Sequence, residues 1–481
     1  MMDSLLNQAD NIILNSKIDN SDHLRPTFHI SPPKGLLNDP NGFIEYDGQY
    51  HLFFQWNPFA CKHGAKFWAH CVSHDLVHWD FKPTALAPDQ EYDRNGCYSG
   101  SAFELDGELH LFYTANLKNE QGERFSTQCL AKANDSRCEK YTKIGPVIHQ
   151  QPAGFTSHFR DPKIWKHQQK WYCVIGAQTE DKLGQVILYK STDAYNWEFV
   201  GPIAGNKIQG LSNFGYMFEC PDLFPLANKD ILIGCPQGIK PQGIFFQNEH
   251  NNGYFVGQFN YEECCYSHGD FRPLDQGFEF YAPQTTEDSQ GRRLLSAWVG
   301  IPGQDEQPTL TFGWIHALSM IRELRIDKGR VYQQPVVEHK KLRRQKIELA
   351  EFELSDNHDF FIETDNCYEL NLAVKSIQST FVIRIMDEGD SWVSLKYDPK
   401  YSLIQLDRNN TNYLDGTREC QLIPCDELEL QIFVDHSVIE VFVNNGEEVF
   451  TSRVFPRDNK SKVTLQSDKS CIISRFVKYD Y

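Results

Sequence analysis

The sequence predicts an all-β protein in which a five-bladed β-propeller is followed by a C-terminal β-sandwich. One motif recurs five times in the first two thirds of the chain, and the last third alternates apolar and polar residues without it. At 481 residues, 40% of them apolar, the chain is long enough for two domains. We therefore expect a helical segment at residues 1–25, the propeller at 26–335, a linker at 336–350 and the sandwich at 351–481.

The N-terminal segment predicts a short amphipathic helix that packs one face on the body of the protein, because its apolar residues fall at helical spacing. These residues are Leu5, Leu6, Ala9, Ile12 and Ile13. The segment has no basic start and no continuous apolar core of the kind a signal peptide needs, and no stretch approaches the roughly 20 apolar residues of a membrane span. We expect no membrane partner and a cytoplasmic location, and we read the 14 scattered cysteines as reduced thiols.

Each copy of the repeated motif opens with a carboxylate or a small residue and continues as a strand, a tight turn and a second strand. The openings are Asp39, Ser99, Asp161, Glu219 and Ala282, spaced by about 60 residues. Asp47-Gly48 and Asp106-Gly107, between alternating apolar runs, predict hairpin turns. A unit of this length holds the four short strands of one blade. Because equivalent positions of radial repeats face one funnel, Asp39, Asp161 and Glu219 should be neighbours.

The segment after residue 335 begins with a charged connector and then has the strand alternation typical of a sandwich. Residues 427–443 alternate, and Asn444-Asn445-Gly446 provides a turn. We expect Asp435, Ser437 and Glu440 to occupy the solvent face of these strands, where polar side chains are common.

The composition excludes some partners and favours others. Lys and Arg number 47 against 65 Asp and Glu, and the net charge of −18 repels nucleic acid. Aromatic residues make up 13% of the chain, which suits sugar binding. His74 and His78 have the spacing of a zinc pair, but Asp75 stands where the general-base Glu belongs and no third ligand is evident. We therefore expect no metal and no cofactor.

Three carboxylates in one register suit glycoside hydrolysis, which needs a nucleophile or base and a protonated acid. Glu219 has apolar neighbours that favour the protonated form, and Asp39 lies among amides that favour the ionised form. Arg160 is a candidate partner that keeps Asp161 ionised. Each feature alone has a structural explanation, since Asp-Pro-Asn-Gly is a good turn and Arg160-Asp161 an ordinary ion pair. Because all three carboxylates fall in the same register of the repeat, a catalytic site is favoured over three separate structural roles.

Further side chains near this funnel are candidates for sugar contacts. Trp56, Trp68 and Trp298 are candidate sugar platforms, although each taken alone is more often a core residue. Gln55 is a candidate hydroxyl-binding amide.

Six motifs together resemble glycoside hydrolase family 32, particularly its bacterial sucrose-6-phosphate hydrolases and β-fructofuranosidases. They begin at Leu37, Phe54, Phe67, Gly96, Phe159 and Phe218 and read LNDPNG, FQWNP, FWAH, GCYSGS, FRDPK and FECPD. The resemblance covers the whole chain and implies the same two-domain fold, retention of configuration and no metal. The sequence departs from the family pattern at Leu37 and Ala69, where many members carry other residues. These departures put the substrate specificity in doubt but not the mechanism, because the carboxylates are intact.

The resemblance implies hydrolysis of the β-fructofuranosyl bond of sucrose or sucrose 6-phosphate. It assigns Asp39 as nucleophile, Asp161 as transition-state stabiliser and Glu219 as acid/base. The substrate contacts that it implies are Asn38, Gln55, Trp68, Tyr98, Ser99, Arg160 and Trp298.

Several alternatives stay open at this level. A fructan hydrolase or a fructosyltransferase has the same fold, and a catalytically silent propeller would bind sugar without cleaving it. Lys62, His63 and Lys66 form either a phosphate-binding cluster or a solvated loop. The oligomeric state is also open, and a homo-oligomer is compatible with the sequence.

Overall fold

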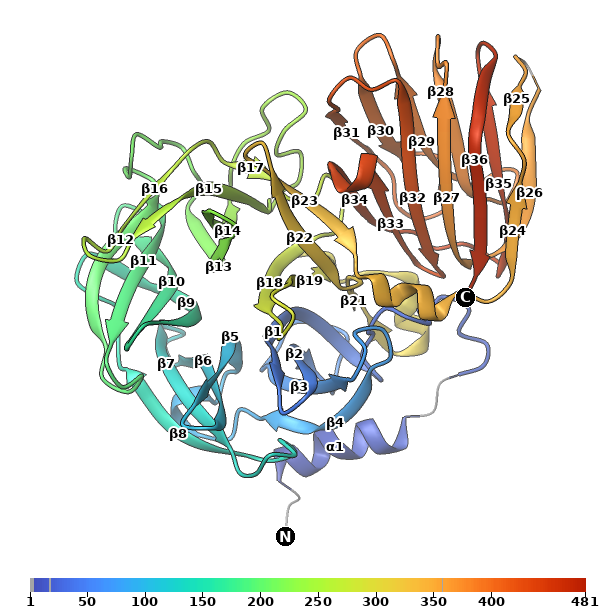
Figure 1. Ribbon diagram of the computed structural model, residues 1–481. Coiled ribbons are helices and arrows are strands. Elements are labelled where there is room, and N and C mark those ends of the chain that lie inside the picture. The colour runs from blue at the N-terminus through green and yellow to red at the C-terminus, as the bar shows by residue number, and fades with distance from the viewer. Residues whose placement is uncertain (1–3, 17–18, 357) are drawn as a thin grey trace.

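The protein is nearly all β in the computed structural model, which describes residues 4–16, 19–356 and 358–481. The strands within these described ranges form seven sheets. Five of them follow one another around a common centre, and the other two lie together beside them (Figure 1). This arrangement is consistent with the expected propeller and sandwich. Among the described residues, no helix has the length and apolar character needed to cross a membrane.

The five sheets around the centre contain four or five strands each. The first comprises β1 (Gly35–Tyr46), β2 (Gln49–Asn57), β3 (Phe67–Ser73), β4 (Asp80–Leu86) and β20 (Trp314–Ile315). The second comprises β5 (Cys97–Leu105), β6 (Glu108–Lys118), β7 (Arg124–Ala133) and β8 (Tyr141–Ile148). The third comprises β9 (Phe155–His167), β10 (Lys170–Thr179), β11 (Gly184–Ser191) and β12 (Glu198–Gly205). The fourth comprises β13 (Met217–Leu226), β14 (Lys229–Gln237), β15 (Gly253–Asn260), β16 (Cys265–His268) and β17 (Arg272–Pro273). The fifth comprises β18 (Tyr281–Glu287), β19 (Arg293–Val299), β21 (Ala317–Leu318), β22 (Arg322–Asp327) and β23 (Arg330–Pro335).

The two remaining sheets enclose one apolar core between them. The larger comprises β24 (Lys346–Leu349), β25 (Phe352–Leu354), β27 (Cys367–Lys375), β32 (Glu427–Asp435), β33 (Val438–Val443), β34 (Glu448–Arg453) and β36 (Cys471–Asp480). The smaller comprises β26 (Phe360–Asp365), β28 (Phe381–Asp387), β29 (Val393–Asp398), β30 (Leu403–Asp407), β31 (Thr417–Gln421) and β35 (Lys460–Ser467). β24 lies inside the range expected for the linker but pairs with β36, so the end of that range belongs to this sheet.

Local sequence explains the hairpins, and a long-range strand pairing joins the two ends of the repeated region. Asp47 and Gly48 have φ of 48° and 74°, and Asp106 and Gly107 have φ of 53° and 80°. Positive φ at both central residues matches the twist of paired strands, and both expected turns are confirmed. β20 then returns to pair in parallel with β1, which joins the end of the repeated region to its beginning.

The strand nearest the centre in each of the five sheets is irregular where the repeated motif falls. These strands are β1, β5, β9, β13 and β18 (Figure 1). Their pairing registers shift after Leu37, Tyr98, Arg160, Glu219 and Tyr281 respectively. A bulge leaves residues unpaired and redirects the side chains beside it. The motifs therefore place polar side chains at the centre instead of in the sheets.

The predicted N-terminal helix is confirmed as α1 (Leu5–Asn15). Ser4 caps it by accepting a hydrogen bond from the Asn7 N–H at 3.2 Å. Its apolar face packs against the core that contains the first sheet, and Ala9 is fully buried there. Asp10 accepts a hydrogen bond from the Thr84 N–H at 2.7 Å, which holds the helix against β4.

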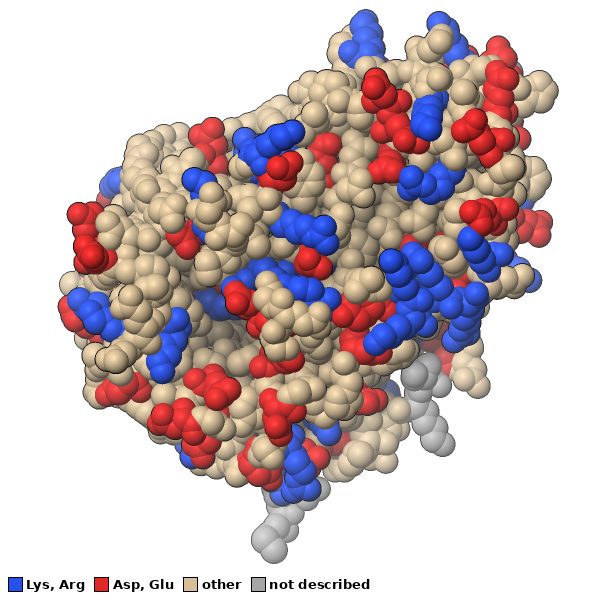
Figure 2. Space-filling model, in the orientation of Figure 1, with Lys and Arg blue, Asp and Glu red and all other residues tan. Residues whose placement is uncertain are grey.

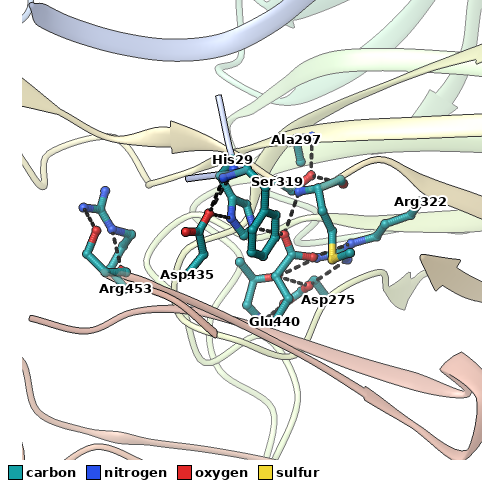
Figure 3. Close-up of polar contacts among 12 residues, drawn as sticks. His29, Asp275, Ala297, Ser319, Arg322, Asp435, Glu440 and Arg453 are labelled. Carbon is teal, nitrogen blue, oxygen red and sulfur yellow. Dashed lines mark hydrogen bonds and ion pairs between the residues drawn. The ribbon is translucent and has the colours of Figure 1, made fainter. Parts of the chain in front are cut away.

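Our expectation for Asp435, Ser437 and Glu440 was wrong, since all three are fully buried where the larger sandwich sheet meets the N-terminal sheets. Asp435 accepts hydrogen bonds from His29 Nδ1 at 2.8 Å and from the His29 N–H at 3.0 Å (Figure 3). Glu440 contacts His29 Nε2 at 3.1 Å and Arg322 Nη2 at 2.6 Å. Strand alternation specifies two faces, and here both are covered.

This buried network makes the stability depend on pH through His29. Burial opposes a charged ring, but Asp435 and Glu440 raise the pKa of His29 from 6.5 to about 9. The raised pKa adds stability that is fully present below pH 6.5 and is lost as the pH rises through 9. We expect the free energy of unfolding to lose on the order of 3 kcal/mol from this group over that interval.

Urea unfolding of wild type and His29→Gln at pH 6 and pH 9.5 measures this contribution. The difference in free energy of unfolding between wild type and His29→Gln should be large at pH 6 and smaller at pH 9.5. His149→Gln, which changes an exposed histidine, is the matched control. A wild-type minus variant difference that does not change with pH would contradict the assignment.

Candidate active site

A cavity of about 460 Å³ lies where the five sheets meet. Figure 2 shows a hollow at this centre, with basic and acidic side chains around it. Every one of the five sheets contributes to its lining. Eight of the residues that we expected at the site line this cavity, namely Asn38, Asp39, Gln55, Tyr98, Arg160, Asp161, Glu219 and Trp298. A larger cavity of about 710 Å³ in the sandwich contains none of the expected site residues.

Two residues expected to contact substrate do not line this cavity. Trp68 is fully buried, and its Nε1 donates to the Tyr98 carbonyl at 3.1 Å, so it supports Tyr98 from behind. Ser99 lies beneath the surface and donates its hydroxyl to Asp39 Oδ2 at 2.5 Å. Trp56 is also buried, with its Nε1 on the Lys34 carbonyl at 2.7 Å. Strand pairing places each of these residues, and the sequence alone does not show which face of a strand turns to the cavity.

Asp39 is held by an amide and hydroxyl network. Ser99 donates to one oxygen, and Asn38 Nδ2 donates to the other at 3.2 Å. Gln55 donates to Ser99 and accepts from Asn38 Nδ2 at 2.9 Å, which orients both donors. Burial raises the pKa of the Asp39 carboxyl, while the Ser99 and Asn38 hydrogen bonds favour its ionised form. The network fixes the carboxylate in one orientation, as a nucleophile requires.

Asp161 lies in the bulge of β9, directly after the paired residue Arg160, and has φ of 69°. Its Oδ2 accepts a hydrogen bond from the Cys220 N–H at 3.0 Å, and Cys220 Sγ lies 3.5 Å from the same oxygen. Burial raises the pKa of Asp161 to about 7; Arg160 opposes this, and the Glu219 and Asp39 carboxylates add to it. Asp161 is therefore only partly ionised near neutral pH, whereas we expected Arg160 to keep it ionised.

Glu219 has the contacts that were expected for Asp161. Arg160 donates to Glu219 Oε1 from Nε at 2.9 Å and from Nη2 at 2.6 Å. Gln237 Nε2 donates to Oε2 at 2.7 Å, and the Tyr281 hydroxyl donates to the same oxygen at 2.6 Å. Burial works against ionisation, but Arg160 and Tyr281 hold the pKa of Glu219 below its ordinary value. The expectation that an apolar setting protonates Glu219 was wrong, because its neighbours in the chain are not its neighbours in space.

The register of the motifs explains this exchange of partners. Cys220 and Ala282, with φ of 49° each, follow the register shift as Asp161 does. Glu219 is the last paired residue before the shift, the place held by Arg160 in β9 and by Tyr281 in β18. Glu219 is therefore one residue out of step with the equivalence we expected. The offset places Glu219 beside Arg160 and Tyr281.

Tyr281, Gln237 and Cys220 were missed as site residues. Tyr281 directly precedes Ala282, the residue that we took as the opening of the fifth copy of the motif. Cys220 follows Glu219 directly. Gln237 ends the strand paired with β13, and no local pattern marks it.

The arrangement combines three coupled carboxyl groups and one guanidinium in a single cavity. Burial raises the pKa of Asp161 to about 7, whereas Arg160 and Tyr281 hold the pKa of Glu219 below its ordinary value. Near neutral pH a partly protonated carboxyl group therefore lies in the same cavity as an ionised carboxylate, as acid-assisted substitution at a sugar carbon requires. The histidines of the zinc-like spacing lie outside the cavity, with His78 Nδ1 on Asp75 Oδ2 at 3.0 Å.

Comparison with protein families gives matches over nearly the whole chain. Residues 29–335 match the glycosyl hydrolases family 32 N-terminal domain, and residues 338–479 match the family 32 C-terminal domain. The chain belongs to glycosyl hydrolase family 32. The resemblance carried by the six motifs is thereby confirmed, and with it the class of enzyme, a glycoside hydrolase.

Individual family 32 members are similar in sequence and in structure. A sucrose-6-phosphate hydrolase of Bacillus subtilis is 44% identical over 94% of this chain and 93% of its own length. One from Salmonella typhimurium is 43% identical over 90% of this chain and 88% of its own length. The solved structure of a sucrose-6-phosphate hydrolase from Lactobacillus gasseri has a TM-score of 0.88 at 32% identity, over 98% of this chain and 96% of that one. A mutant β-fructofuranosidase from Bombyx mori in complex with sucrose has a TM-score of 0.87 at 31% identity, over 100% and 98% of the two chains.

Proposed function

We propose that this family 32 enzyme cleaves the terminal β-D-fructofuranosyl bond of sucrose or sucrose 6-phosphate with retention of configuration and releases fructose. The observation that carries the proposal is that Asp39, Asp161 and Glu219 line one cavity. Relatives named sucrose-6-phosphate hydrolase and the similarity to a β-fructofuranosidase bound to sucrose support the choice of substrate.

In the first step, Asp39 attacks C2 of the fructosyl unit while Glu219 protonates the departing glycosidic oxygen. The proton is drawn from the cluster. Sugar hydroxyls that donate hydrogen bonds to Asp161 favour its ionised form and lower its affinity for the proton, which Glu219 then takes up. Asp161, once ionised, stabilises the positive charge that develops at C2.

In the second step, Glu219 removes a proton from water, and the water attacks C2 and frees Asp39. Ester formation has removed the negative charge of Asp39, which otherwise raises the free energy of an ionised neighbour. The Arg160 guanidinium and the Tyr281 hydroxyl stabilise the Glu219 carboxylate. The same contacts that oppose proton uptake in the first step therefore support base catalysis in the second.

The proposal extends to architecture and location. The five sheets are the five blades of a propeller at 26–335, and the residues from 336 to the start of β24 link it to the sandwich. The enzyme acts in the cytoplasm, which agrees with 14 cysteines that are all free thiols.

The test is to follow sugar release from purified protein by NMR. We expect fructose to appear first as the β-furanose anomer, since two displacements at C2 restore the original configuration. Release of the α anomer first, or no release, would contradict the proposal. Parallel values of kcat/KM for sucrose, sucrose 6-phosphate, raffinose and inulin test a fructan hydrolase, and transfer products at high sucrose reveal a fructosyltransferase.

A further inference from the structure

Lys66 presents an unpaired buried charge to the catalytic cavity. It ends the loop between β2 and β3, it is 3% exposed, and it lines the cavity that contains Asp39 and Glu219. Within the described part of the chain its Nζ makes no hydrogen bond. A buried ammonium without acceptors carries a large desolvation cost, so its acceptors are expected to arrive with the substrate.

Arg160, another cation that lines this cavity, is already neutralised. Arg160 is paired with Glu219 through two hydrogen bonds. Lys66 has no such partner, although the Asp39 and Asp305 carboxylates act on it through space. Burial lowers the pKa of Lys66 to about 8, so the amine is still mostly charged at neutral pH.

His63 lies in the same loop and also lines the cavity. Its Nε2 is 3.6 Å from Asp305 Oδ1, so a carboxylate lies beside this loop. Lys62, expected to join the cluster, is exposed and does not line the cavity. The basic cluster suggested by the sequence therefore divides into Lys66, which is buried, His63, which is exposed but lines the cavity, and Lys62, which is exposed and does not line it.

We propose that Lys66 and His63 bind the phosphoryl group of a leaving glucosyl unit phosphorylated at its 6-position. The inference rests on the proposed function, because it places this unit beside the cleaved fructosyl bond. A sugar hydroxyl offers one acceptor and no charge, whereas a phosphoryl group offers three acceptor oxygens and a negative charge. Asp305 opposes the phosphoryl group and sets how strongly the site prefers it.

The direct test compares Lys66→Met with Lys62→Met, which removes the same charge from the same loop outside the cavity. We expect Lys66→Met to lower the ratio of kcat/KM for sucrose 6-phosphate to kcat/KM for sucrose by about 10- to 100-fold. Lys62→Met should change neither substrate beyond about threefold. Equal losses on both substrates would overturn the proposal, since Lys66 would then act through Asp39 or the sugar. An unchanged ratio of the two substrates would overturn it as well.

Product inhibition provides a second readout that does not need full catalytic competence. We expect glucose 6-phosphate to inhibit wild-type sucrose hydrolysis more strongly than glucose does, and Lys66→Met to remove that difference. Lys66→Arg retains the charge and should preserve the stronger inhibition by glucose 6-phosphate. This variant provides the test if Lys66→Met does not fold. Equal inhibition of wild type by glucose and glucose 6-phosphate would overturn the proposal.

Asp305→Asn removes a negative charge near the proposed phosphate site and should have the opposite effect to Lys66→Met. Removing this charge should raise the kcat/KM ratio of sucrose 6-phosphate to sucrose, and a lower ratio would contradict the proposal. Wild-type sucrose hydrolysis separates the two levels of inference. If the wild-type enzyme does not cleave sucrose, the proposed function is wrong. If it cleaves sucrose but the variants do not change its preference between sucrose 6-phosphate and sucrose, only the proposed phosphate site is wrong.

Discussion

Asp39→Asn is expected to abolish most sucrose hydrolysis while leaving the protein folded. Asparagine has nearly the same shape but cannot form the ester intermediate, so kcat should fall by roughly 10⁴-fold, or about 5 kcal/mol of transition-state stabilisation. Burial raises the pKa of Asp39, which means that the folded protein disfavours its charge. The variant should therefore unfold at the same temperature as wild type or at a higher one.

Fructose release and thermal unfolding, measured on the same preparation, test both parts. Asp230→Asn is the matched control, because Asp230 is a buried aspartate on β14 whose pKa is also raised by burial. It lies outside the cavity and should retain near-wild-type activity. An Asp39→Asn protein that is folded and hydrolyses sucrose at a rate within tenfold of wild type would refute the nucleophile assignment.

Glu219→Gln is expected to lower kcat for sucrose by about 10²- to 10⁴-fold, the usual contribution of general acid and base catalysis. Its effect on stability should be opposite to that of Asp39→Asn. The pKa of Glu219 is held below its ordinary value, so its carboxylate stabilises the fold above pH 4.5 and loses that effect as the pH falls through the lowered value. At neutral pH the neutral glutamine leaves Arg160 without a countercharge, and the unfolding temperature should fall.

An aryl β-fructofuranoside separates acid catalysis from a merely structural role. Its leaving group departs without protonation, so the first step should be much less impaired in Glu219→Gln than with sucrose. The ester should then accumulate, because the second step still lacks its base, and a burst of aryl alcohol should precede slow turnover. Equal losses on sucrose and on the aryl substrate, without a burst, would indicate that Glu219 only positions other groups.

Much of the fold and the identity of the three carboxylates could be predicted from the sequence, because these features are local. Asp47-Gly48 and Asp106-Gly107 specify turns through the φ values they tolerate, and apolar alternation specifies strands. The even spacing of the motifs predicted that five local patterns meet at one cavity, and that cavity contains Asp39, Asp161 and Glu219 as expected.

The tertiary structure decided which groups touch and therefore what state they are in. A one-residue offset at the bulges pairs Arg160 with Glu219 and leaves the pKa of Asp161 raised by burial, and neighbours in the chain do not reveal this. The packing of the sandwich on the N-terminal sheets buries Asp435 and Glu440, and loop closure turns Lys66 inward and Lys62 outward. Local sequence determines backbone conformation and alternation, whereas pKa values and partners depend on distances across segments that the chain brings together only when it folds.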